Sequence, residues 1–101
     1  MASRLKLSGI LNAIPGVKKV YFQPPESVKL VYPCIIYKMT SIDTWYADNA
    51  LYMSRNEYQV MVIDTDPDTK IPDLVSQLPL CRAERFFVSD NLYHYPFTLY
   101  F

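Results

Sequence analysis

The stretch of sequence that decides the fold is Glu57-Tyr58-Gln59-Val60-Met61-Val62-Ile63-Asp64. It is rich in β-branched and aromatic residues, which favour a strand. Alternation places Tyr58, Val60 and Val62 on one face, and Met61 and Ile63 on the other. Because both faces are apolar, the pattern predicts a strand in the middle of a sheet.

Other strands are predicted on both sides of this segment. Residues 32–40 alternate in the same way, with Pro33 at the start because proline cannot donate to a strand ladder. Residues 42–46 are expected to form a second strand after a kink or tight turn, and residues 17–22 a short one. Residues 47–56 are polar and irregular, and we expect a loop there. The last strands are residues 81–89 and 93–101, joined by a turn at Asp90-Asn91.

Two segments have the spacing of amphipathic helices. The first has Leu7, Ile10, Leu11 and Ile14 on one face, with Ser3 as a candidate cap and Pro15-Gly16 at its end. The second has Ile71, Leu74, Val75 and Leu78 on one face, with Pro72 in its first turn and Pro79 after its end.

The order of these elements predicts the fold class. Strands arrive in runs rather than in a βαβα repeat, which indicates an α+β protein. We expect an N-terminal helix, a mostly antiparallel sheet of four to five strands, and a second short helix before a C-terminal β-hairpin. With 101 residues the chain is too short for two ordinary domains, so residues 1–101 are expected to form one.

Composition and charge limit the classes of function. Ten basic residues balance ten acidic ones. This balance argues against nucleic-acid reading and against binding to anionic membranes, since both need a surplus of Lys and Arg. No apolar run approaches the ~20 residues of a membrane span, and the N-terminus is a poor signal peptide. We expect a soluble protein whose two cysteines, Cys34 and Cys81, are reduced thiols in the cytoplasm.

A search for chemistry finds no catalytic, cofactor-binding or metal-binding motif. Asp64-x-Asp66-x-Asp68 resembles the start of a calcium loop, but Thr69 stands where glycine is needed and Val75 where the bidentate glutamate belongs. His94 is the only histidine, and two glycines cannot build a phosphate-binding loop. We therefore expect a protein that is not an enzyme and needs no cofactor. An enzyme that uses His94 remains the weakest alternative.

Aromatic residues are more informative. Nine tyrosines exceed what one small core needs, because each buried hydroxyl requires a partner. Tyrosine, tryptophan and arginine are enriched at the centres of protein interfaces. We predict a protein interface at Trp45, Tyr46, Leu51, Tyr52, Met53 and Arg55. The alternative is that Trp45 and Tyr46 pack on the sheet while the loop is solvated.

Particular stretches carry a resemblance that covers nearly the whole chain. They are an N-terminal helix, then Val31-Tyr32-Pro33-Cys34-Ile35-Ile36-Tyr37, then Arg55-Asn56-Glu57-Tyr58-Gln59-Val60-Met61-Val62, and a closing hairpin that ends Leu92-Tyr93-His94-Tyr95-Pro96-Phe97-Thr98-Leu99-Tyr100. In order and residue type they resemble the tail-completion or tail-terminator proteins of long-tailed bacteriophages, a family of minor tail proteins.

The resemblance implies a structural role in the virion. Members of that family look like small subunits that form a ring, typically a hexamer, at the head-proximal end of the tail. The implied partners are other copies of the chain, the tail tube protein, and the connector or head-completion protein. The implied locations are the virion tail and, during assembly, the host cytoplasm. The short helix-to-hairpin segment and few glycines depart from the family pattern. A head–tail adaptor, another minor tail subunit and a small monomeric protein-binding module remain alternatives.

Overall fold

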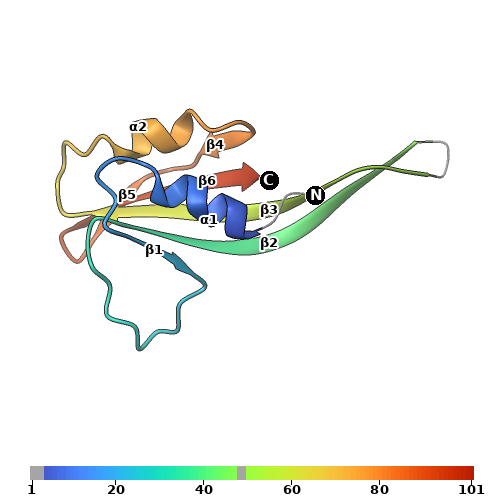
Figure 1. Cartoon of the computed structure of the whole chain (residues 1–101). Coiled ribbons are helices and arrows are strands. Elements are labelled where there is room, and N and C mark those ends of the chain that lie inside the picture. Colours follow the sequence, from blue (N-terminus) through green and yellow to red (C-terminus); the bar gives the residue numbers. More distant parts are fainter. Residues whose placement is uncertain (1–3, 48–49) are drawn as a thin grey trace.

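The computed structural model describes residues 4–47 and 50–101, and the side chains of residues 42–55 lie outside this description. The chain is an α+β fold, as predicted (Figure 1). In order, its elements are α1 (Arg4–Asn12), β1 (Lys19–Phe22), β2 (Cys34–Ala47), β3 (Ala50–Asp64), α2 (Ile71–Ser76), β4 (Cys81–Ala83), β5 (Phe87–Ser89) and β6 (Leu92–Tyr100).

The strands form one sheet in the order β1-β2-β3-β6-β4, with β5 also paired to β6. β3 lies between β2 and β6, so the central position predicted for residues 57–64 is confirmed. The sheet has six strands rather than four to five. It is mostly antiparallel, as predicted, and is mixed only because β1 runs parallel to β2 with Lys19 beside Cys34.

The predicted strand 81–89 is divided into β4 and β5. Ala83 pairs with Phe97 and Phe87 pairs with His94, so three residues of this edge lie opposite only Tyr95 and Pro96. An extra residue on one strand interrupts a ladder, and Pro96 has no N–H to offer there. The turn at Asp90-Asn91 is as predicted, and both residues have the positive φ of a two-residue hairpin turn, 53° and 61°.

Both helices lie over one face of the sheet (Figure 1). Leu7 and Leu11 of α1 and Ile71 and Val75 of α2 are buried at the spacing predicted from the sequence. They pack on the inward side chains of the central strands: Ile35, Tyr37, Tyr58, Val60, Val62, Phe97 and Leu99. Ser3, the candidate cap of α1, lies outside the described residues.

Two fully buried tyrosines connect the sheet to the helix. The rings of Tyr37 and Tyr58 lie 5.9 Å apart, and Phe22 packs on Tyr37 at 5.0 Å. The Tyr37 hydroxyl accepts a hydrogen bond of 3.4 Å from Arg4, whose guanidinium also lies 4.3 Å from the centre of the Phe22 ring. Arg4 thus gives a buried hydroxyl its partner and joins the first turn of α1 to β1 and β2.

The loop predicted over residues 47–56 is wrong: the backbone continues as strand to Ala47 and again from Ala50. β1 pairs with β2 only over residues 34–37, and β6 pairs with β3 only over residues 57–64. Residues 42–47 and 50–55, called the arm below, pair only with each other among the described residues. Figure 1 shows the arm extending well beyond the body.

The burial of α1 leads to a stability prediction. Leu11 is fully buried in the core, whereas Leu5 on the same helix is 70% exposed. Leu11→Ala should lower the free energy of unfolding by about 3 kcal/mol, because most of a buried leucine side chain is lost and a cavity remains. Leu5→Ala is the matched control and should change it by less than about 0.5 kcal/mol. Urea unfolding followed by circular dichroism measures both, and equal losses would contradict the placement of α1.

Candidate assembly site

The arm is the feature that separates this chain from a simple layered α+β domain. Its two strands are antiparallel, with Thr44 beside Ser54 and Asp43 beside Arg55. The register shifts once within the arm, between Trp45 and Tyr46, and once just before it, between Met39 and Ser41. Such irregularities raise the local twist of a strand pair. The molecule is correspondingly long, with extents of 51 × 27 × 23 Å.

All six residues predicted as an interface belong to the arm. Trp45 is the register partner of Met53, and Tyr46 is the partner of Leu51. Tyr52 and Arg55 lie on β3. The sequence therefore grouped residues that the fold also brings together. Those predicted in the loop, Leu51, Tyr52, Met53 and Arg55, lie on β3 instead. Their side chains lie outside the described residues, and their role as contacts stays a prediction.

The root of the arm is fixed by backbone and side-chain bonds. Asn56 and Phe101 exchange two backbone hydrogen bonds, of 3.2 and 2.9 Å, which pair the end of the chain with β3. Asn56 is 7% exposed and its amide nitrogen donates to the Tyr58 hydroxyl at 3.4 Å. Its side-chain oxygen is buried and finds no hydrogen-bond partner within the described part of the chain. The body thus ends, and the arm begins, at a buried polar residue.

A groove of about 550 Å³ lies beside β2 near the root of the arm. We call it the proline groove; its lining residues are Gln23, Pro24, Pro25, Glu26, Val28, Leu30, Ile36, Lys38 and Met39. Gln23 holds its inner wall, since the Gln23 N–H donates to Tyr37 O at 3.0 Å and the Gln23 side chain accepts from the Met39 N–H at 3.4 Å. The two prolines stiffen the outer wall.

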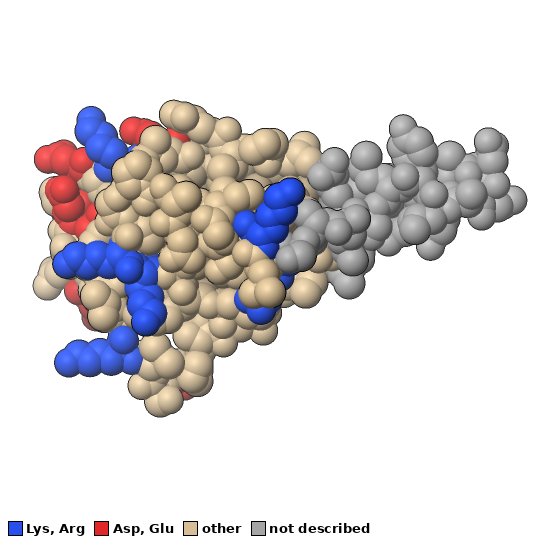
Figure 2. Space-filling view, viewed as in Figure 1, with Lys and Arg blue, Asp and Glu red and all other residues tan. Residues whose placement is uncertain are grey.

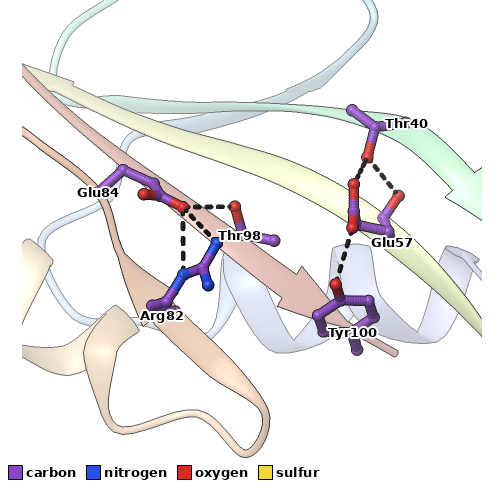
Figure 3. A network of polar contacts seen from close by, with 6 residues as sticks. All are labelled: Thr40, Glu57, Arg82, Glu84, Thr98 and Tyr100. Carbon is purple, nitrogen blue, oxygen red and sulfur yellow. Dashed lines mark hydrogen bonds and ion pairs between the residues drawn. The ribbon is translucent and has the colours of Figure 1, made fainter.

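The sheet face away from the helices carries two polar networks (Figure 3). In the first, Glu57 accepts hydrogen bonds from the hydroxyls of Thr40 at 2.6 Å and Tyr100 at 2.8 Å, which joins β2, β3 and β6. In the second, Glu84 accepts from Thr98 at 2.9 Å and from Arg82 at 3.0 Å. These bonds hold the pKa of each carboxyl below its ordinary value, with the threonine as the first cause in both cases.

The remaining candidate groups for chemistry do not come together. The Nδ1 atom of His94 lies 3.0 Å from Leu92 O, and its ring stacks on Phe87. Asp64 and Asp66 each accept a backbone N–H two residues on, as turn-forming aspartates do. Burial raises the pKa of the Cys34 thiol to about 11, which keeps it protonated and unreactive. Among the side chains that the structure describes, those of residues 4–41 and 56–101, no group of three or more His, Cys, Asp or Glu could hold a metal ion.

An exposed apolar edge was missed by the sequence analysis. Phe86, Phe87 and Val88 are all about half exposed, on and just before β5. The sequence interpretation treated this segment as part of one strand over residues 81–89. The signal that could have found the edge is the run Phe86-Phe87-Val88-Ser89, which has no charged residue and is followed directly by a turn.

On the side of the body drawn in Figure 2, charge does not mark out a binding site. Figure 2 shows one side of the body, where acidic side chains gather at one end, basic side chains are dispersed, and uncharged surface fills the middle. The described helices include none long and apolar enough to cross a membrane. Comparison of the chain with family models, with curated proteins and with solved structures finds no match.

The Glu57 network generates a pH prediction. Tyr100→Phe removes one donor, so the pKa of Glu57 should rise toward its ordinary value of 4.5. Because the folded-state pKa is lowered, the ionised carboxyl stabilises the fold above pH 4.5 and this contribution is lost as the pH falls through the lowered pKa. The variant should therefore lose less stability on acidification.

The measurement is an NMR titration of the Glu57 carboxyl carbon. Tyr93→Phe is the matched control, because Tyr93 lies at the other end of β6, beside Asp64. If neither variant moves the pKa of Glu57, the hydrogen bond from Tyr100 does not tune it.

Proposed function

We propose that this chain is a non-enzymatic structural virion protein that completes a phage tail tube and joins it to the head connector, as a ring of identical subunits. The observation that carries the proposal is the arm. The resemblance of the sequence to tail-completion proteins supports the same function and suggests where it is carried out, at the head-proximal end of a phage tail. Its partners would be other copies of the chain, the tail tube protein and the head connector or head-completion protein.

The arm needs a covering partner for a physical reason. A two-stranded hairpin in water is marginally stable at best, and three strands or packing against another element are usually required. The arm has no third strand among the described residues. Its two outer edges also expose backbone groups that invite pairing with another chain. A neighbouring subunit or the tail tube would supply the missing contacts.

A ring satisfies this requirement for every subunit at once. A heterologous contact joins two different surfaces, and it repeats until the rotation closes. The arm is one such surface. The proline groove is a candidate for the other, because it lies on the body beside β2 and is hollow and largely apolar. A neutral net charge adds little self-repulsion to the assembly of many copies.

The test removes three of the large side chains that are predicted to make contacts on the arm. A variant with Trp45→Ala, Tyr52→Ala and Met53→Ala should stay folded, because the buried core lies in the body. It should fail to form rings, alone or on purified tail tubes, and fail to support head–tail joining. Light scattering and electron microscopy follow the rings, and complementation of a phage lacking the gene follows the joining.

The matched control changes exposed apolar residues of the body instead. Leu5 and Val31 are 70% and 50% exposed, so Leu5→Ala with Val31→Ala should leave rings and joining intact. Normal infectious particles from the arm variant would refute the role of these residues. A wild-type chain that forms no ring, either free or on tail tubes, would refute the ring itself.

A further inference from the structure

The free edge formed by β5 has the features of a contact surface. Phe86, Phe87 and Val88 are 52%, 44% and 55% exposed. β5 pairs with β6 on one side, and no strand among the described residues pairs with its other side. Natural proteins protect open edges with charges, prolines or covering elements. The run 86–89 has none of these, in contrast to β1, whose edge begins with Lys19.

The two phenylalanines are held in place although they are exposed. The Phe86 ring stacks on Tyr95 with centres 5.4 Å apart and planes 14° apart. The Phe87 ring stacks on His94 at 4.7 Å and 9°. His94 and Tyr95 are neighbours in a strand, so their side chains point to opposite faces of the sheet. The edge therefore carries a fixed aromatic ring on each face, which lowers the entropic cost of binding a further strand.

Hairpin geometry gives the direction of the free backbone groups. In a two-residue hairpin, the pair that flanks the turn is hydrogen-bonded, and hydrogen-bonded and open pairs then alternate. Ser89 and Leu92 flank the turn here, so Val88 and Tyr93 form the open pair. Val88 therefore presents its N–H and its C=O to the outer edge. A symmetric antiparallel partner can pair with both groups if it is centred on the same residue.

We propose that two copies of the chain pair through β5, antiparallel and about a two-fold axis at Val88, so that the two sheets become continuous. Charge complementarity favours a second copy as the occupant. In this register Phe87 lies opposite Ser89 of the other copy, so the segment that carries Arg85 passes close to the Asp90-Asn91 turn of that copy. The side chain of Arg85 is long enough to reach the Asp90 carboxylate of the other copy. Because the axis is two-fold, this ion pair forms twice in the dimer. Both residues are exposed in the single chain.

This contact is independent of the proposed function. It is isologous, so it is complete when two copies have met, whereas a ring needs a heterologous contact. It uses β5 and leaves the arm untouched. A pair of copies is consequently expected whether or not the chain forms rings on a tail.

The decisive variant places a charge at the axis. Val88→Lys brings two ammonium groups together at the centre of the contact, and it should weaken the dimer by at least about tenfold in Kd, because like charges opposite each other in a sheet repel. Leu5→Lys is the matched control, a lysine at an exposed apolar residue on α1, and should leave the Kd unchanged. Sedimentation velocity across concentration measures both, and circular dichroism confirms that both variants are folded.

A charge exchange tests the register. Arg85→Glu places a second acid beside Asp90 of the other copy and should also weaken the dimer. Adding Asp90→Asn removes the repulsion while keeping a residue suited to positive φ, and should restore part of the affinity. A wild-type chain that is monomeric at all concentrations would overturn the proposal, and so would a dimer that Val88→Lys does not weaken. A dimer lost only in the Trp45, Tyr52 and Met53 variant would place the contact on the arm instead.

Discussion

The pairing of β3 with β2 on one side and β6 on the other is the interaction on which the rest of the structure depends. It forms the middle of the sheet, and Tyr58, Val60 and Val62 between these neighbours are fully buried. α1 and α2 pack on this inner face, and burial of apolar area there drives folding. Loss of this pairing would leave both helices without a surface to cover.

The same pairing also creates the arm, because β2 and β3 run on after their other neighbours have ended. β1 pairs with β2, and β6 with β3, only within the body. Beyond it β2 and β3 continue as a two-stranded pair. The change occurs at Asn56, which Tyr58 and Phe101 hold in place. One ladder thus has two environments: within the body other elements flank or cover it, and in the arm its two strands pair only with each other among the described residues.

The two proposed contact surfaces differ in symmetry and in origin. The arm results from long strands and suits a heterologous contact, which builds rings. The β5 edge results from a short strand that leaves backbone and aromatic groups uncovered, and it suits an isologous contact between two copies of the chain. Because they lie on different strands, β2 and β3 on one hand and β5 on the other, assembly through one surface leaves the other available.

Much of the fold could be predicted from local signals. The spacing of Leu7, Leu11, Ile71 and Val75 indicated both helices, because each buries one face on the sheet and that burial leaves a periodic pattern. The turn at Asp90-Asn91 followed from residue types that tolerate positive φ. The absence of motifs for bound phosphate or metal was likewise read directly from residue types and their spacing.

The sequence by itself determined the helices, the central strand and the grouping of aromatic residues near residues 45–55. Only the tertiary structure decided that this group lies on a protruding strand pair, that residues 84–86 interrupt the last edge opposite Pro96, and that Phe86 and Phe87 are exposed. The reason is physical. Periodicity records burial against a core, so a strand with no core beside it gives no such signal, and whether an edge is open depends on which distant strand ends first.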